Sequence, residues 1–426
     1  MKAVHVIGAG MSGLSCALRL AEAGLAVSVY EAGPRAGGRC RSYQDDKLGC
    51  VIDNGNHLVL SGNHAVARLL ATTGADKTEV TVGEARFPFF DLDSGERWAL
   101  RLSNGRIPWW IFRPSRRPPG TQLSDFLSVL KVMRAGPKAT VASLIPKTHR
   151  LYRCFWEPFT LAVLNTAPDE AAACLLRPVF EETFARGGAE CRPVLTRHGL
   201  SAALVEPTVH RLQALGGALH FGARARSLKV ENGRAAALDI AGEEIALGEN
   251  DAVVVAVSPD NAKALLPEVT APDRYRPILN VHFKLPDSLV GRAKEPFLGL
   301  LGGLSQWVFF RGNVASVTVS AASGSLDDPA DAIAATTWRE VTRALAAEGT
   351  PLPPHRIIKE KRATFAQTPA QIVKRPKQRS VYGNLWLAGD WTESELPATI
   401  EGSVRSGEKA ARAILDVGAK ENVAVL

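Results

Sequence analysis

The chain has 426 residues, of which 46% are hydrophobic and 22% charged, which is typical of a globular protein with room for two or three domains. Lys and Arg outnumber Asp and Glu by 51 to 43, a basic balance that suits an anionic partner or none in particular. No apolar run reaches the ~18 residues of a membrane span, and no nucleic-acid-binding module is present, so neither a membrane-spanning nor a nucleic-acid-binding protein is expected.

The six cysteines form no CxxC pair and no spacing that suits a metal. They are typical of reduced thiols in the cytoplasm. We therefore expect a cytoplasmic protein without a metal site.

The N-terminal stretch has the pattern of a dinucleotide-binding unit. An apolar run at residues 3–7 leads into Gly-Ala-Gly-Met-Ser-Gly at 8–13, and residues with helical spacing and a second apolar run at 26–30 follow. Gly8 permits a tight turn, Gly10 lets the backbone approach a pyrophosphate, and Gly13 lets the helix lie close to the strand. The helix N-terminus then faces the phosphates. The expected cofactor contacts here are Gly8, Ala9, Gly10, Met11, Ser12 and Gly13.

The second strand ends at Glu31, 18 residues after Gly13, where a carboxylate can bind ribose hydroxyls. Ala32 follows, and Gly37-Gly38-Arg39 comes next. Two adjacent glycines allow a close approach to a second phosphate face, and Arg39 places a charge beside it. The pattern E-x5-GGR resembles the flavin amine oxidase and phytoene desaturase superfamily, which implies FAD rather than NAD.

A polar turn, Asp53-Asn54-Gly55-Asn56-His57, comes next. In the resembled superfamily this stretch lies near the flavin ring, which implies that residues 54–57 contact the cofactor. A solvated Asn-Gly turn remains the alternative, and His57 alone could equally have a structural role.

Residues 97–117 contain six arginines, three tryptophans and no acidic residue. Trp109, Trp110, Ile111 and Phe112 stand between Pro108 and Pro114, and residues 121–134 are predicted to form a helix with one apolar face. Together they are our candidate for a membrane-docking face, because aromatic residues and arginines favour an anionic lipid boundary. Packing of Trp109 and Trp110 inside the protein is the alternative.

Residues 155–165 are aromatic and apolar with a single acid, Glu157. From residue 200 a helical pattern ends at Gly216-Gly217, β-like runs follow to Ser258-Pro259, and residues 281–320 are rich in strands. Residues 329–347 are predicted to be a helix.

The C-terminal part contains a second motif that suits the cofactor. An apolar strand delivers Gly389-Asp390, and Pro-Ala-Thr-Ile-Glu-Gly at 397–402 opens the last helix. A carboxylate there can bind ribitol hydroxyls, and the helix N-terminus can face the pyrophosphate or the flavin carbonyls. The pattern closely resembles the superfamily's C-terminal FAD motif, which implies contacts from Gly389, Asp390, Thr399, Ile400 and Ser403.

The middle of the chain, FWEPFTLAVLNTAPDEAA and FARGGAECRPV, resembles the squalene-associated FAD-dependent desaturase family. The resemblance implies reductive removal of the hydroxyl of hydroxysqualene to give squalene, in hopanoid biosynthesis, with hydride from the reduced flavin. Such an enzyme takes a long apolar isoprenoid substrate and needs an electron donor, which the sequence does not identify. Burial among aromatic residues favours a protonated Glu157, our candidate catalytic acid, and a surface or ion-paired glutamate is the alternative.

The expected fold is α/β: a discontinuous Rossmann-like FAD-binding domain (residues 1–90, 195–260 and 381–420) and an α+β substrate domain (residues 91–194 and 261–380). We expect peripheral association with the inner face of the membrane. Two alternatives stay open: an FAD-dependent isoprenoid desaturase or amine oxidase, which would oxidise its substrate, and a non-catalytic flavoprotein in a lipid pathway.

Overall fold

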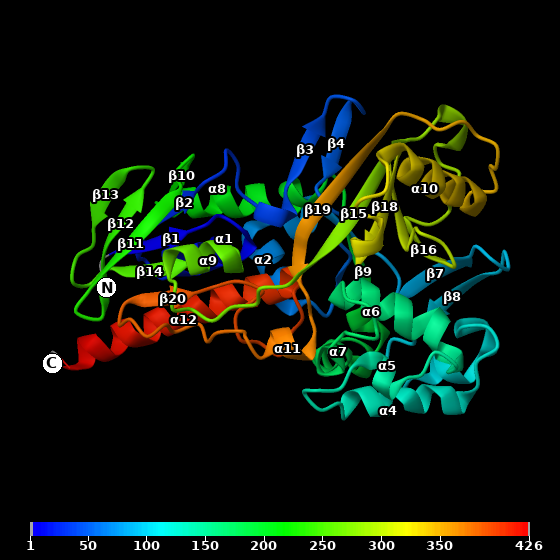
Figure 1. Cartoon of the computed structure of the whole chain (residues 1–426), viewed down its shortest axis with the longest axis horizontal. Coiled ribbons are helices and arrows are strands. Elements are labelled where there is room, and N and C mark those ends of the chain that lie inside the picture. Colours follow the sequence, from blue (N-terminus) through cyan, green and yellow to red (C-terminus); the bar gives the residue numbers. More distant parts are fainter. Residues whose placement is uncertain (1–2, 425–426) are drawn as a thin grey trace.

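The computed structural model describes residues 3–424, with side chains described to residue 417. Its first layer is a parallel five-stranded sheet (Figure 1). The strands in spatial order are β10 (Ala218–Phe221), β2 (Ala26–Glu31), β1 (Ala3–Ile7), β14 (Ala252–Val255) and β20 (Leu385–Leu387). Three distant segments of the chain therefore meet in one sheet, and β1 and β14 lie near its centre.

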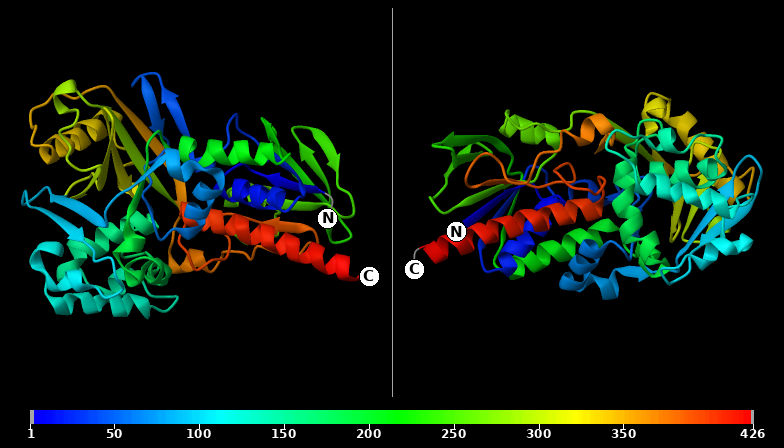
Figure 2. Two further views of the ribbon diagram at one scale, coloured as in Figure 1. Left: turned by 180° about the vertical axis from the view of Figure 1, so that it is seen from behind. Right: turned by 90° about the horizontal axis from the view of Figure 1, so that it is seen from below.

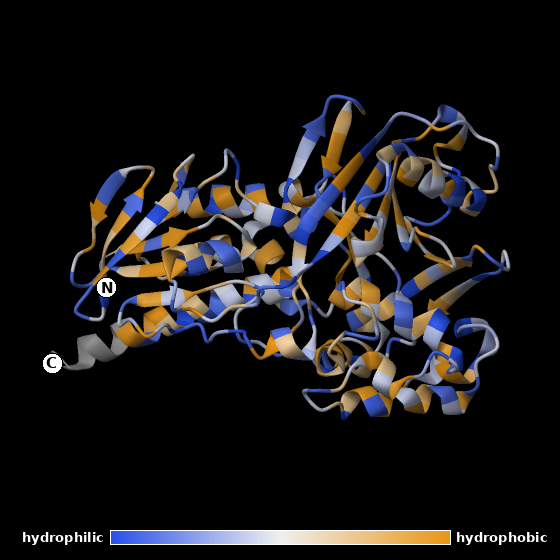
Figure 3. Ribbon diagram, viewed as in Figure 1, coloured by the Kyte–Doolittle hydropathy of each residue, from blue (hydrophilic) through white to orange (hydrophobic). Residues whose placement is uncertain are grey.

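Both faces of this sheet are covered, which explains why all four residues of β14 are buried and apolar (Figure 3). One face packs on α1 (Met11–Glu22), α2 (His64–Thr73), α8 (Glu206–Ala214) and α12 (Ile400–Ala424). The other packs on α9 (Pro259–Leu265) and a three-stranded antiparallel sheet of β11 (Ala225–Glu231), β12 (Arg234–Ile240) and β13 (Glu243–Ala246).

A seven-stranded mixed sheet forms the second layer. Its order is β19 (His355–Phe365), β15 (Tyr275–Lys284), β18 (Val314–Ser320), β17 (Trp307–Arg311), β16 (Phe297–Leu301), β7 (Arg86–Asp91) and β8 (Arg97–Arg101). Residues of β15 alternate, so that Leu279, Val281 and Phe283 pack with α10 (Ala330–Ala344) on one face. Asn280 and His282 lie on the other face, which is turned towards residues 53–56.

A helical unit lies beside the second sheet, at the end of the molecule away from the C-terminus (Figure 2). It contains α4 (Ser128–Met133), α5 (Val141–Leu144), α6 (Glu157–Leu164) and α7 (Leu176–Glu182), packed around Trp156 and Phe180. The remaining elements are β3 (Ser42–Asp45), β4 (Cys50–Asp53), β5 (Val59–Leu60), β6 (Val80–Val82), β9 (Pro193–Thr196), α3 (Ala75–Thr78) and α11 (Pro369–Ile372).

Two details differ from the sequence-based expectation. The helix expected at residues 121–134 consists of a 3₁₀ turn, Leu123–Leu127, followed by α4, because the Ser128 hydroxyl donates to the Asp125 carbonyl and accepts from the Trp156 indole. In addition, β7 begins at Arg86 and pairs with β8 and β16, so the seven-stranded sheet starts a few residues before residue 91. Within residues 3–424, the structure contains no helix with the length and apolar character needed to cross a membrane.

Candidate functional site

The turn between β1 and α1 is packed so closely that only glycine fits at two positions. A Cβ on Gly8, whose φ is +102°, would lie 2.7 Å from the carbonyl oxygen of Ala256, and a Cβ on Gly13 would lie 2.0 Å from the Gly8 oxygen. At Gly10 an added Cβ would meet nothing within 4 Å. The turn therefore has no free space at Gly8 and Gly13, but it has free space at Gly10. This space allows a phosphate to approach the backbone.

The N-terminus of α1 is available to an anion. Its N-cap residue, Gly10, makes no side-chain cap, and the first turn, which includes the buried Met11 and Ser12, has no acidic residue. The backbone N–H groups of that turn and their partial positive charge are thus free for a ligand.

Glu31 lies at the end of β2 and is fixed by two backbone donors. Its Oε2 accepts from the Ala9 N–H at 2.9 Å, and its Oε1 accepts from the Gly33 N–H at 2.8 Å. The carboxylate is partly exposed, and Ala32 beside it is exposed. A carboxylate held at this point can accept hydrogen bonds from sugar hydroxyls next to the β1–α1 turn.

The Gly37-Gly38-Arg39 segment joins the two ends of the chain. The Gly37 N–H donates to the Ala9 carbonyl at 2.8 Å, and a Cβ on Gly37, whose φ is +104°, would lie 2.8 Å from Val205. Arg39 forms an ion pair of 2.7 Å with Asp390, and this neighbour raises the pKa of the Arg39 guanidinium. Motifs 350 residues apart in sequence are therefore in direct contact.

The C-terminal motif is held in place by hydrogen bonds between its own residues. The Gly389 N–H donates to Ser406 Oγ at 2.9 Å, and the Thr399 hydroxyl accepts from the Gly402 N–H at 3.1 Å, which caps the start of α12. Ile400 is buried in the first turn, and Ser403 is half-buried one turn later. The start of α12 is consequently rigid.

Arg375 is a residue of this motif that sequence reasoning missed. Its guanidinium donates to the carbonyls of Asp390, Thr392, Ser394 and Leu396, so one side chain holds the whole loop before α12. Burial lowers its pKa to about 10. Its sequence neighbourhood, Lys-Arg-Pro-Lys, is typical of a solvated loop, and no local pattern could have identified this role.

The polar turn at residues 53–57 is tied to both layers. Asp53 is buried and accepts from Ser42 Oγ (2.5 Å), Leu200 N (2.9 Å) and Arg311 Nη1 (2.7 Å). Asn54 is also buried, and its amide donates to Glu360 on β19 at 3.2 Å. These hydrogen bonds hold the start of the turn in place, and Gly55, Asn56 and His57 follow directly after it.

His57 is exposed, yet surrounding protein lowers the pKa of its imidazole by desolvation. Two charged groups also act on this pKa: Asp53 raises it and Arg39 lowers it.

One face of the seven-stranded sheet lies next to this turn, and its residues differ in polarity between the two edges of the sheet. Towards β7 and β8 it is aromatic and apolar, with Trp98 stacked on Phe89 at 4.4 Å between ring centroids, and towards β15 it is polar. The aromatic part consists of Phe87, Phe89, Trp98, Leu100, Phe297, Trp307 and Phe309, and the helical unit adds Phe155 and Phe184.

Glu157, the candidate acid, begins α6, and desolvation raises the pKa of its carboxyl. It lies on the opposite side of the helix from Phe155 and Phe159, whose rings stack at 5.3 Å. Among the described residues, no hydrogen bond or ion pair joins Glu157 to the cofactor segments. The structure therefore joins the β1–α1 turn, Glu31, residues 37–39 and Asp390 through shared contacts, and no such contact links them to Glu157 in the part of the chain that it describes.

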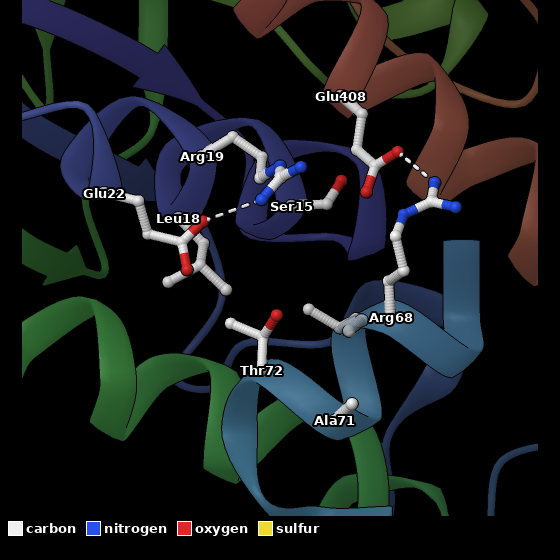
Figure 4. Close-up of a pocket in the computed structure, with 9 residues that line it drawn as sticks. Ser15, Leu18, Arg19, Glu22, Arg68, Ala71, Thr72 and Glu408 are labelled. Carbon is white, nitrogen blue, oxygen red and sulfur yellow. Dashed lines mark hydrogen bonds and ion pairs between the residues drawn. The ribbon is translucent and has the colours of Figure 1, made fainter. Parts of the chain in front are cut away.

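A separate hollow of about 180 Å³ lies between α1, α2 and α12 (Figure 4). Its charged groups are paired with one another, Arg19 with Glu22 at 3.0 Å and Arg68 with Glu408 at 2.7 Å. It shares no residue with the predicted cofactor contacts, and we assign it no role.

Comparison with known proteins gives a full-length match. The model of the family described as flavin containing amine oxidoreductase matches residues 11–415. The chain is 45% identical over 418 residues to a hydroxysqualene dehydroxylase of Rhodopseudomonas palustris, covering 98% of this chain and 99% of the relative. It is 44% identical to a hydroxysqualene dehydroxylase of Sinorhizobium fredii, covering 96% of this chain and 97% of the relative.

Among solved structures, a variant of putrescine oxidase superposes with a TM-score of 0.71 at 17% identity, covering 97% of this chain and 99% of that chain. At this level of identity the likeness concerns the fold alone. The predicted α/β fold of the amine oxidase type is confirmed.

Proposed function

Because this chain belongs to the flavin containing amine oxidoreductase family and, within it, to the hydroxysqualene dehydroxylases, we propose that it reductively removes the hydroxyl of hydroxysqualene to give squalene. It is an FAD-dependent oxidoreductase. The observation that carries the proposed reaction is the match at 44–45% identity over nearly the whole length of each relative.

The residues around the β1–α1 turn fit FAD. The open space before Gly10 and the uncapped N-terminus of α1 suit its pyrophosphate, and Glu31 suits the adenosine ribose. Arg39 and Asp390 would then lie towards the ribityl and flavin part, with residues 54–57 and the start of α12 beyond them. When bound in reduced form, FAD supplies a hydride.

The reaction is a two-electron reduction. The allylic C–O bond breaks, the oxygen gains a proton and leaves as water, and the carbon gains a hydride, while the reduced flavin becomes oxidised. An external electron donor must then restore the reduced cofactor. The chain has to orient a long hydrocarbon, keep water from a delocalised cation, and supply the proton.

The aromatic part of the seven-stranded sheet suits the first two tasks. Phe89, Trp98 and Trp307 form a contiguous set, with centroid distances of 4.4 and 5.4 Å from Phe89 to the other two rings. Aromatic faces contact hydrocarbon favourably and stabilise a cation by their quadrupole. This surface favours an isoprenoid substrate.

The direct test is anaerobic incubation of photoreduced protein with hydroxysqualene, followed by lipid analysis. We expect squalene and oxidised FAD in equal amounts. If reduced protein leaves hydroxysqualene unchanged, or if the oxidised protein dehydrogenates an isoprenoid or an amine instead, the proposed reaction is wrong.

Glu157 is our proposed proton donor. Its raised pKa supports this role, since a protonated carboxyl must persist near neutral pH, whereas its position on the far side of α6 from Phe155 does not favour it. Glu157→Gln should lower the single-turnover rate by about 10²-fold or more if it is the acid, because general acid catalysis contributes 10²–10⁴-fold. Glu348→Gln, at an exposed position after α10, is the matched control and should keep the wild-type rate, and an unchanged rate in the Glu157 variant would exclude the role.

We also propose that the protein docks on an anionic membrane without spanning it. Six of the 13 large apolar side chains that are exposed in the described residues lie between residues 107 and 130. This docking face consists of Ile107, Trp109, Phe112, Leu123, Leu127 and Leu130. Exposed basic residues adjoin it in sequence, namely Arg106, Arg113, Lys131, Arg134 and Lys138.

Trp110 behaves differently from Trp109. Its ring packs edge-on against Phe126 at 5.3 Å and joins the aromatic part of the sheet, while Trp109 is 62% exposed. The docking face and the proposed substrate surface are thus continuous through Trp110. A substrate that resides in lipid could enter along this path.

A further inference from the structure

A hydrogen-bonded group of side chains lies where the aromatic and polar parts of the sheet face meet. Asn56 Nδ2 donates to Thr318 Oγ1 at 2.9 Å, and the Thr318 hydroxyl donates to Asn280 Oδ1 at 3.1 Å. Asn280 in turn donates to the Asn54 carbonyl at 3.3 Å. These contacts fix one turn residue and two strand residues in a single orientation.

Contacts link this group to the predicted cofactor residues. Asn54 donates to Glu360 on β19, and three residues later on the same strand the Ala363 carbonyl accepts from Arg39 at 2.7 Å. Arg39 is the residue paired with Asp390. The group therefore stands between the cofactor segments and the aromatic surface, where the reacting end of a substrate must lie.

Two hydrogen-bonding atoms beside Thr318 have no partner among the described residues. Trp307 is the cross-strand neighbour of Thr318, and its indole N–H is buried without an acceptor. The amide of Asn56 donates to the Ser316 carbonyl and to Thr318, and its Oδ1 accepts no hydrogen bond within residues 3–424. An N–H group that is buried without an acceptor is unfavourable, so a ligand that pairs it is favoured.

One donor and one acceptor are what an alcohol requires. A hydroxyl donates one hydrogen bond and accepts up to two, so it can accept from the Trp307 N–H and donate to Asn56 Oδ1. An ammonium group has no lone pair for the indole N–H, and a hydrocarbon would leave both atoms unpaired. The unpaired N–H of Trp307 and the unpaired Oδ1 of Asn56 together favour an alcohol over an amine or an alkene.

From this geometry we propose that Trp307 and Asn56, oriented by Thr318 and Asn280, bind the oxygen of the substrate's hydroxyl. The inference rests on the proposed function and deepens it, since it names the residues that recognise the departing group. In this position the oxygen is held beside the cofactor segments, while the hydrocarbon extends along Phe89 and Trp98. The site also explains why product leaves: squalene lacks the atom that these two residues bind.

The test compares hydroxysqualene with squalene, which differ chiefly in the hydroxyl. Both are titrated into oxidised holoprotein, which cannot turn over, and binding is followed through the flavin absorption spectrum. We expect the wild type to prefer the alcohol. Trp307→Phe removes the N–H and keeps the ring, and Asn56→Leu removes the acceptor at similar volume; each should reduce the preference about 3- to 10-fold, the value of one hydrogen bond, with squalene affinity unchanged.

Trp338→Phe is the matched control, because this indole lies on the opposite face of the same sheet and donates to the Thr350 carbonyl. It should keep the full preference. If both test variants keep the wild-type preference, the proposal is overturned. It is also overturned if they lose FAD or alter its spectrum without ligand, since the residues would then hold the cofactor.

Failure of the proposed function gives a different result. In that case the reduced wild type does not convert hydroxysqualene at all. A wild type that converts hydroxysqualene but binds it no better than squalene would retain the proposed function and overturn this inference alone.

Discussion

A substitution at Gly10 should affect cofactor binding without affecting folding, because a Cβ added there would meet no atom of the chain within 4 Å. We expect Gly10→Ala to fold with a melting temperature close to that of the wild-type apoprotein. Its methyl group would occupy the space where a pyrophosphate approaches, so FAD affinity should fall by at least about 10-fold. FAD content after purification and titration of apoprotein measure this.

The control for that substitution is Gly136→Ala, which also has open space at its Cβ but lies outside the cofactor segments. It should bind FAD as the wild type does. A yellow Gly10→Ala protein with unchanged FAD affinity would contradict the assignment of this turn.

His282 should make stability depend on pH. It is 1% exposed, its Nε2 has no partner among the described residues, and desolvation lowers its pKa from 6.5 to about 4. The unfolded chain then binds more protons than the folded chain between pH 4 and 6.5, so the free energy of unfolding falls as the pH drops through this window. The stabilisation, fully present above pH 6.5, amounts to about 3 kcal/mol at 1.36 kcal/mol per pKa unit.

Chemical denaturation of His282→Gln at pH 4.5, 5.5, 6.5 and 7.5 tests this expectation. The variant should lose most of the dependence between pH 4.5 and 6.5, whereas His210→Gln, at an exposed position of α8, should keep it. Equal pH slopes in wild type and His282→Gln would show that other groups dominate.

The residues that sequence reasoning found and those it missed differ in how their roles are encoded. Gly8, Gly10 and Gly13 act through local backbone geometry, so their spacing alone reveals them. Arg375 and Thr318 act through partners that are 15 to 262 residues away in sequence. Such roles depend on tertiary contact, which the local pattern does not contain.

At the scale of elements, α1 and α12 pack closely against each other in the cofactor layer. A Cβ on Gly407 would lie 2.1 Å from the Ser12 carbonyl oxygen and 2.2 Å from Ser15 Oγ. Gly407→Ala should therefore push the two helices apart and lower the free energy of unfolding by about 1–3 kcal/mol, the usual cost of overpacking. Because both helices begin at the proposed FAD site, FAD affinity should fall as well.

Thermal melts of the apoprotein and FAD titrations test this together. The contrast with Gly10→Ala is the informative part, since only Gly407→Ala should destabilise the protein without cofactor. An apoprotein melting temperature equal to that of the wild type would show that α12 can shift without cost.

Whole elements were predictable where one periodicity dominates. The apolar run of β14 and the helical pattern of α10 fall within the predicted ranges, because each is buried along a continuous run or face. The alternation in β15 was visible as Ile-Leu-Asn-Val-His-Phe, but it does not tell which layer the polar face meets. The helix at residues 121–134 divides because Ser128 bonds to Asp125 and to Trp156, and the second partner is distant in sequence.

At the scale of the whole molecule, the arrangement of the units indicates which end of the protein would face the membrane in the proposed docking. The helical unit lies at the end of the molecule opposite the C-terminus (Figure 2), and the docking face continues into its helix α4 at Leu130. Trp110 and Phe155 connect the docking face to the aromatic part of the sheet. A lipid substrate could then reach the cofactor without crossing water.

Flotation with liposomes tests the docking face. Wild-type protein should float with vesicles that contain anionic lipid and less so at high salt, because each basic residue near the surface contributes about 1 kcal/mol and salt screens this attraction. Replacing Trp109, Phe112 and Leu127 together with serine should abolish flotation, since each apolar side chain contributes about 1.5–3 kcal/mol on burial. Trp110 is left unchanged because it packs on Phe126.

The control carries serine at Val373 and Val381, which are 75% and 84% exposed but lie far from residues 107–130 in sequence. It should float like the wild type, and both variants should keep their FAD, because the replaced side chains are exposed and none is among the predicted cofactor contacts. Equal flotation of the triple variant and the wild type would place the docking face elsewhere. Loss of flavin or precipitation of the triple variant would instead show that these side chains pack inside the protein, and the proposed entry path would be wrong.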